Sequence, residues 1–77
     1  MNNPRRKELR KALELLAEAR CIIEAMQEEE QECFDNMPEG LQESEQGEKI
    51  EENAERLEEL MNCLEEQEDE LDDIING

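Results

Sequence analysis

The sequence predicts an all-α fold: an antiparallel two-helix hairpin, coiled-coil-like, that dimerises into a four-helix bundle. Three observations lead to this prediction. Apolar residues recur at steps of three and four in two long segments, which is the period of one helix face. A short stretch with Pro38, Gly40 and Gly47 separates the segments. Bases gather at the start of the chain and acids at its end, so the two segments attract each other when they run antiparallel.

The first helix is expected over about residues 4–35. Pro4 suits a first turn, where its missing amide donor would be unpaired in any case, and Asn2 or Asn3 can cap the helix. With Leu9 at heptad position a, the residues expected to face the second helix follow at a and d. The a positions hold Leu9, Leu16, Ile23, Glu30 and Met37, and the d positions hold Ala12, Ala19, Met26 and Cys33.

A loop is expected over about residues 36–44, because Pro38 disfavours helix at the residue before it. Ser44 is the predicted N-cap of the second helix. Gly47 then falls in the first turn, where a glycine costs on the order of 1 kcal/mol relative to alanine. The helix start could therefore slip to Glu48.

The second helix is expected over about residues 45–75, and its apolar steps are stricter than those of the first. Asn76 and Gly77 suit its C-terminal end. The residues that alternate at steps of four and three are Ile50, Ala54, Leu57, Met61, Leu64, Glu68, Leu71 and Ile75. Only Glu68 interrupts this coiled-coil-like seam.

The distribution of charge also favours the hairpin. Residues 1–11 hold five bases and one acid, whereas residues 65–73 are almost entirely acidic. Both placements oppose the helix macrodipole, and an antiparallel partner compensates for this. Pairing residues whose numbers sum to about 84 aligns the two seams and sets Lys11 near Asp73.

The two edges of the predicted hairpin differ. One edge is apolar and is predicted to join two copies as a homodimer, because its side chains would otherwise stay in water. It consists of Leu15, Ile22, Leu60 and Ile74. The other edge is charged and is available to a basic protein partner. It holds Glu51, Glu58, Glu65 and Asp72 from the second helix, with Arg20, Gln27, Leu13 and Phe34 from the first.

Two acids at seam positions need partners, because an isolated buried charge is costly. Glu68 is expected to reach Arg20 or Lys11, and Glu30 lies opposite Ala54. Such polar residues more often specify register than catalyse a reaction.

The three cysteines form no CxxC pair, and their acidic surroundings do not favour a reactive thiol. They are Cys21, Cys33 and Cys63. With no apolar signal-peptide core and no membrane-length apolar run, we expect a cytoplasmic protein.

The composition argues against an enzyme. The chain has 25 acids, 8 bases and no His, Tyr or Trp, with a net charge of -17. That charge repels nucleic acid and anionic membranes and favours basic proteins. Acids three or four apart, such as Glu48 with Glu52 or Glu65 with Asp69, could bind Mg²⁺ as in all-α nucleotide pyrophosphohydrolases, but they face outward. We therefore expect no catalytic residue, no metal site and no cofactor.

The segments Arg5–Lys11, Phe34–Gly47 and Glu51–Asn53 resemble a family of short uncharacterised proteins of phages, prophages and mobile elements of Firmicutes. The resemblance implies a small α-helical protein of phage or bacterial origin and assigns it no activity. The expected function is a protein-binding scaffold or adaptor. The alternative is an acidic inhibitor that mimics nucleic acid on a basic protein surface.

Overall fold

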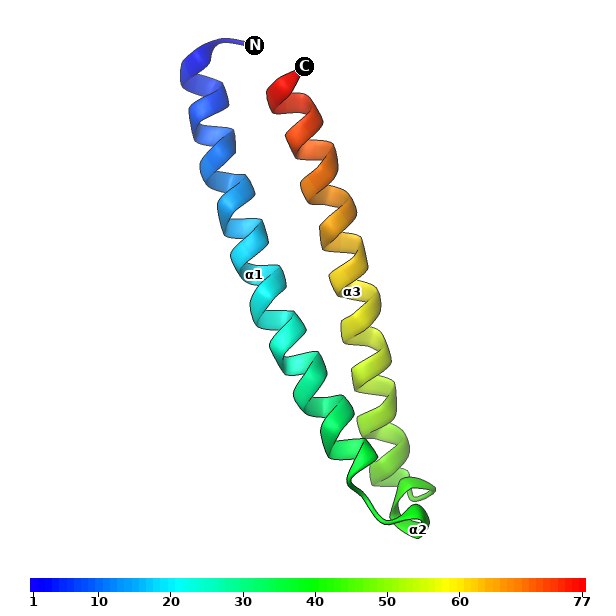
Figure 1. The fold of residues 1–77 in the computed structure, drawn as a ribbon. Coiled ribbons are helices and arrows are strands. Elements are labelled where there is room, and N and C mark those ends of the chain that lie inside the picture. The colour runs from blue at the N-terminus through cyan, green and yellow to red at the C-terminus, as the bar shows by residue number, and fades with distance from the viewer.

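Two long helices lie side by side and run in opposite directions (Figure 1). The computed structural model describes the whole chain, residues 1–77. Helix α1 spans Asn3–Asp35, the single turn α2 spans Glu39–Gln42, and α3 spans Glu45–Asn76. Both termini lie at one end and α2 at the other, in a rod of 58 × 14 × 13 Å. The predicted helical hairpin is confirmed, with both long helices starting or ending within a residue of the expected positions.

The N-terminus of α1 is capped by Asn2. Its side-chain oxygen accepts a hydrogen bond from the Arg5 backbone N–H at 2.9 Å, which satisfies one of the donors that a helix start leaves free. Asn3 is the first helical residue, and Pro4 falls in the first turn as predicted. At the other end, the Asn36 N–H donates to the Glu32 carbonyl at 3.0 Å, and the helix stops before Pro38.

The predicted loop contains the short helix α2, which the sequence reasoning missed. Pro38 ends α1, but its φ of -55° also suits the start of a new turn. Its carbonyl accepts hydrogen bonds from the N–H groups of Leu41 and Gln42 at 2.8 and 3.0 Å. The Gln42 side chain then donates to the Phe34 carbonyl at 2.9 Å, so α2 is tied back to the end of α1.

Gly47 joins α2 to α3 by close packing. Ser44 caps α3 as predicted, and its hydroxyl accepts from the Gly47 N–H at 3.2 Å and donates to the Leu41 carbonyl at 2.5 Å. Gly47 is buried, and a Cβ atom there would collide with the Leu41 carbonyl oxygen and lie 2.5 Å from that of Gln42. The expectation that Gly47 might delay the helix start was wrong, because α3 begins at Glu45 and the glycine lets α2 approach it.

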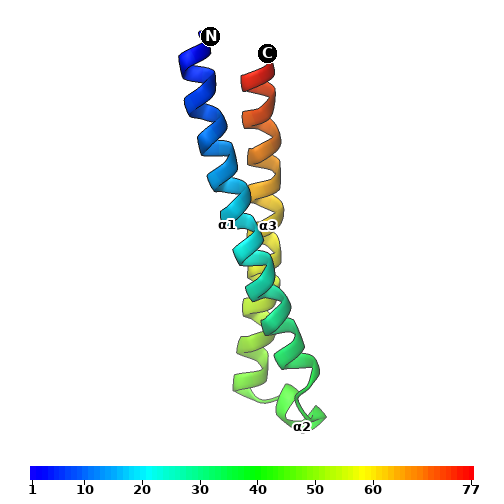
Figure 2. The same cartoon turned by 60° about the vertical axis from the view of Figure 1, so that its left-hand side comes forward.

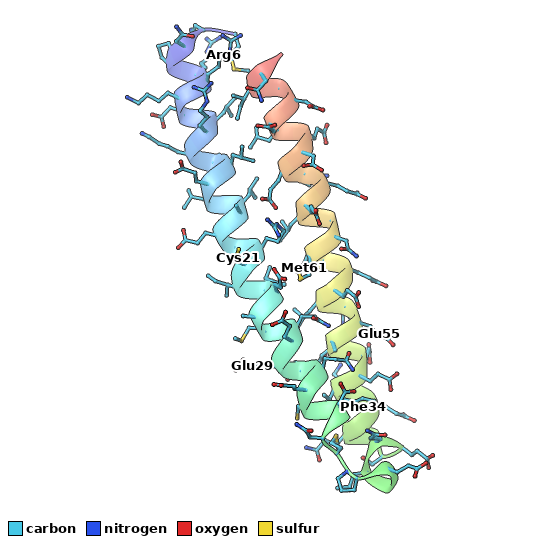
Figure 3. All side chains as sticks on the ribbon, in the orientation of Figure 1. Arg6, Cys21, Glu29, Phe34, Glu55 and Met61 are labelled. Carbon is cyan, nitrogen blue, oxygen red and sulfur yellow. The ribbon has the colours of Figure 1, made fainter.

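The face of α3 that packs on α1 is the predicted seam. Ala54 and Ile75 are only 1% and 2% exposed, and the other six seam residues are half-buried. Met61 lies between the two helices (Figure 3). Strict alternation of steps of four and three therefore identified the buried face of this helix correctly.

The face of α1 that packs on α3 is rotated from the predicted one. The a positions are half-buried as expected, but the d residues Ala19, Met26 and Cys33 are exposed. The half-buried residues that alternate with the a positions are instead those at e: Leu13, Arg20, Gln27 and Phe34. Ala19 and Cys33 offer little apolar surface, whereas Leu13 and Phe34 offer more, so the helix turns Leu13 and Phe34 inward and leaves Met26 exposed. We call the end of the rod that holds α2 the closed end, and the end that holds both termini the open end. Figure 3 shows Phe34 beside α3 at the closed end.

The predicted register agrees with the contacts between the helices. Leu16 shares a groove with Gln67 and Leu71, and Glu30 shares one with Asn53 and Leu57. These neighbours bracket the partners expected when residue numbers sum to about 84. Lys11 and Asp73 form no ion pair, because the Lys11 amine pairs with Glu8 on its own helix at 2.9 Å.

The hairpin has almost no interior of its own. Only 3 of its 77 residues are buried, namely Gly47, Ala54 and Ile75. Viewed after a turn of 60°, the helices cross one another and form a single layer (Figure 2). No part of either long helix is apolar over the length needed to cross a membrane. A pair of helices in one layer leaves half of each helix surface without a protein neighbour.

Candidate functional site

A strip of large apolar side chains runs along the exposed surface of both long helices. We call it the outward strip, and it consists of the four residues predicted for self-association. Leu15 and Ile22 of α1 are 65% and 60% exposed, and Leu60 and Ile74 of α3 are 47% and 49% exposed. Large apolar side chains gain free energy when they are removed from water.

Each residue of the outward strip is followed in the chain by an inward-facing apolar residue. Leu16, Ile23 and Met61 are half-buried, and Ile75 is buried. Adjacent residues in a helix point about 100° apart, so both members of a doublet cannot lie against the same neighbour. The doublets Leu15-Leu16, Ile22-Ile23, Leu60-Met61 and Ile74-Ile75 therefore supply two separate apolar faces.

The rotation of α1 enlarges the outward strip. Met26, predicted to face α3, is 45% exposed, and Ala19 is also exposed. With Leu15 and Ile22 they form a second series at steps of three and four, which is the pattern of a helix-packing face. The sequence reasoning missed Ala19 and Met26 as surface residues, although the small side chains at neighbouring d positions were a signal that this face packs loosely on α3.

Two shallow grooves lie beside the outward strip and link it to the seam. One is lined by Leu16, Leu64, Leu71 and Ile74 with two polar residues. The other contains Leu60 and Leu57 with Glu30 and Arg56. Leu60 and Ile74 thus lie on the same side of the seam as Glu30 and Leu16 of α1. Leu60 and Ile74 of α3 therefore border the seam, whereas Leu15 and Ile22 of α1 line neither groove.

The acidic edge lies on α3, on the opposite side of the seam from Leu60 and Ile74. All four of its residues are exposed, and none takes part in an ion pair. They recur every seven residues, a spacing of about 10 Å along a helix. The edge consists of Glu51, Glu58, Glu65 and Asp72. Arg20 and Gln27, predicted to share this edge, turn into the seam, so the edge is more uniformly acidic than expected.

One ion pair connects the two long helices. The Arg20 Nε atom donates to the Glu68 carboxylate at 2.5 Å, and the Glu68 side chain is only 12% exposed. The hydrogen bond and the negative charge of Glu68 raise the pKa of Arg20 above its ordinary value. The predicted pairing of Glu68 with Arg20 is confirmed. It gives the one charged residue of the α3 seam a partner of opposite charge.

Glu30 is the other polar seam residue, and it lies half-buried in the groove with Asn53 and Arg56. It forms no ion pair; the Arg56 guanidinium pairs instead with Glu52 at 4.0 Å. Arg6, near the open end (Figure 3), holds a buried Nε atom that has no hydrogen-bond partner. Polar groups therefore occupy several positions of the face between α1 and α3.

The structure brings no cluster of potential metal ligands together. No three His, Cys, Asp or Glu side chains lie close enough together to hold a metal ion. Glu52, one of the acids considered for Mg²⁺, is shared by Lys49 and Arg56 on its own helix. All three cysteines are free and exposed, including Cys33, which was expected in the seam.

No protein-family model, no curated protein and no solved structure matches this chain. The resemblance to short phage and mobile-element proteins stays a prediction. The inference of function therefore rests on the surfaces described above.

Proposed function

We propose that this chain is a non-enzymatic scaffold or adaptor that acts as a homodimer, in which two hairpins join through their outward strips as a four-helix bundle. The exposed outward strip is the observation that carries the proposal. Burying a Leu or Ile side chain completely contributes about 1.5–3 kcal/mol. The four exposed strip residues of each copy can thus supply several kcal/mol to an association.

The thin interior of the hairpin supports the same proposal. Domains of this size bury too little surface to be very stable alone, and many gain stability by oligomerising. Here only three residues are buried in the single chain. A second hairpin laid on the apolar face would convert the half-buried a residues into a closed core, as in other four-helix bundles.

The acidic edge would remain open in such a dimer, and a basic protein is the partner we propose for it. None of its four carboxylates forms an ion pair, and charge complementarity speeds association and favours one class of partner. The free thiols suit a reducing compartment, and we propose the cytoplasm.

The unpaired acids also favour a second candidate function, an acidic inhibitor that occupies the nucleic-acid site of a basic protein. Binding of this kind weakens steeply as salt rises, because the charges involved are exposed and screened. An adaptor contact through apolar groups keeps its strength. Repeating the binding measurement at low and high salt separates the two functions.

Light scattering on the purified chain tests the homodimer. The chain has a mass of 9.1 kDa, and the proposal requires twice that mass with the helices intact by circular dichroism. A mass of one chain at concentrations up to the millimolar range would overturn it.

Charge-neutral variants test the acidic edge. Glu51→Gln, Glu58→Gln, Glu65→Gln and Asp72→Asn together should abolish capture of a basic partner. A control with four other exposed acids of α3 neutralised, Glu55→Gln, Glu59→Gln, Glu66→Gln and Asp69→Asn, removes the same charge elsewhere and should retain capture. Equal loss in both variants would show that net charge alone, and not this edge, determines binding. Calorimetric uptake of Mg²⁺ or Mn²⁺ by the wild-type chain would instead favour the metal-enzyme alternative.

A further inference from the structure

The negative charge of the hairpin is distributed very unevenly along its length. The half at the open end, residues 1–20 and 61–77, holds six bases and ten acids, a net charge of -4. The half at the closed end, residues 21–60, holds two bases and fifteen acids, a net charge of -13. Because α1 and α3 lie side by side over their whole length, these two groups of residues occupy opposite ends of the rod (Figure 1).

A second copy can lie on the apolar face in two symmetric ways. If both closed ends point the same way, the -13 half of one copy faces the -13 half of the other. If the copies are head-to-tail, each -13 half faces a -4 half. Coulomb repulsion scales with the product of the charges, so head-to-tail docking lowers the repulsion between copies by roughly 40%.

The apolar residues of α1 are also arranged symmetrically about the middle of the helix. Leu15, Ala19, Ile22 and Met26 centre between residues 20 and 21, close to the midpoint of Asn3–Asp35. A two-fold axis across the rod at this point would place Leu15 against Met26 of the second copy and Ala19 against Ile22. Such an isologous contact matches an apolar strip with itself.

The same axis brings opposite charges together at both ends of the contact. Lys7 and Lys11 of one copy would lie beside the stretch from Glu28 to Asp35 of the other. This stretch contains acids and no base, whereas five of the eight bases of the chain lie between Arg5 and Lys11. Lys7, Arg10 and Lys11 are all exposed, and Lys11 pairs with Glu8 of its own helix at 2.9 Å.

We infer that two copies of this chain dock head-to-tail, α1 against α1, with the basic start of one helix on the acidic end of the other. This inference rests on the proposed homodimer and adds its orientation. The occupant of the outward strip is a second copy of the chain. The closed end of the second copy lies at the opposite end of the bundle from that of the first. The two α2 turns are therefore far apart.

The distance between the two closed ends tests the orientation. Gly40 lies in α2, and a Cβ atom there meets nothing within 4 Å, so Gly40→Cys introduces a harmless labelling site. The three exposed cysteines are replaced by Ser. Electron-electron dipolar spectroscopy on the spin-labelled full chain, at about 50 mM salt, where screening is weak, then measures the separation of the labels in the dimer.

Head-to-tail docking predicts a label separation of about 50 Å, from 1.5 Å per residue over the distance from the centre of α1 to each α2. Same-direction docking predicts about 20 Å, the width of a four-helix bundle. A dimer with the short distance overturns the orientation and leaves the proposed homodimer standing. A monomer under the same conditions overturns both.

A charge variant tests the cause of the orientation. Lys7→Glu, Arg10→Glu and Lys11→Glu change the open-end half from -4 to -10, which nearly removes the asymmetry. The same spin-labelling measurement should then show a second population at the short distance. If the variant dimer keeps only the long distance, charge does not set the orientation, and the inference from charge is overturned.

Discussion

The two members of each apolar doublet face different environments. Comparing them shows how the polar and apolar groups of the hairpin are distributed. Ile23 is half-buried against α3, whereas Ile22 beside it is 60% exposed. The inward face of α1 also holds Arg20, Gln27 and Glu30, while the outward series of Leu15, Ala19, Ile22 and Met26 holds no polar residue. The hairpin thus places polar groups between its own helices and leaves its most uniformly apolar face open. Such a distribution suits a chain that completes its core by association.

Substituting the two isoleucines separately should give the largest and most informative difference. Ile22→Ser should weaken self-association by roughly 100-fold or more, because a symmetric dimer loses two buried side chains and each 1.4 kcal/mol is a factor of ten. Ile23→Ser should instead lower the free energy of unfolding of the hairpin by about 2 kcal/mol. Sedimentation equilibrium measures the first and thermal unfolding by circular dichroism the second.

The two variants control each other, because they have the same composition and adjacent positions in one helix. In dilute solution, where the chain is monomeric, Ile22→Ser should unfold at the wild-type temperature. Equal effects of both substitutions on association and on stability would mean that the doublet does not divide these roles.

Gly47→Ala tests the closed end, where α2 packs on the start of α3. The new methyl group would meet the backbone carbonyls of Leu41 and Gln42, and overpacking of this kind costs about 1–3 kcal/mol. The matched variant is Gly40→Ala in α2, where nothing lies within 4 Å, and it should be neutral or slightly stabilising. Urea unfolding of both variants gives the comparison, and equal stability would show that α2 does not pack on Gly47 in solution.

Arg20→Leu tests the polar part of the inward face. It leaves the Glu68 carboxylate, 12% exposed, without its cation, so the midpoint of thermal unfolding should fall. Replacing both residues by Leu should restore or exceed the wild-type midpoint, because an apolar pair often replaces an ion pair at no cost. If the double variant is less stable than Arg20→Leu alone, an unpaired Glu68 carboxylate is not unfavourable at this position, and this explanation of the pair is wrong.

The same ion pair should not make stability depend on pH in the ordinary range. The contribution of a cation whose pKa is raised by folding is complete below its unfolded pKa and is lost only as pH rises through the folded value. For Arg20 both pKa values lie above the range in which the chain would be studied. Unfolding midpoints of the wild type and Arg20→Leu should therefore differ by the same amount at pH 7 and pH 9.

Ser44→Ala should have a small effect. It removes the hydroxyl that accepts from the Gly47 N–H and should cost about 1 kcal/mol, as other N-cap replacements do. Asn2→Ala removes the equivalent cap of α1. Because α1 begins at the free end of the hairpin, where helix ends fray, its loss should lower the unfolding midpoint less than that of Ser44.

The sequence predicted α3 better than α1, and the reason is physical. Along α3, one series of steps is apolar at every position except Glu68, and Leu60 and Ile74 are the only large apolar residues outside it, so one face is clearly preferred. Along α1, the doublets give two competing apolar faces, and the heptad count could not decide which d or e residues turn inward. Side-chain size and the attraction of Arg20 to Glu68 decided it, and neither follows from periodicity.

The surfaces were more predictable than their details. The exposed outward strip and the exposed acidic edge follow from heptad positions that any antiparallel pair shares. The turn α2 and the need for glycine at position 47 depend on the close approach of the α2 backbone to α3. No local sequence pattern predicts this approach. Predicted pairing of the N-terminal bases also failed in part, because Lys11 found Glu8 on its own helix, and exposed ion pairs are too weak to fix such choices.

The most direct test of the account is the dependence of thermal stability on protein concentration. If two hairpins complete each other's core, the unfolding midpoint of the wild-type chain must rise with concentration, because association stabilises the folded state by mass action. The variant Leu15→Ser/Ile22→Ser should lose this dependence while keeping its helices. A wild-type midpoint that stays constant from micromolar to millimolar chain, with no further assembly detected, would contradict the account.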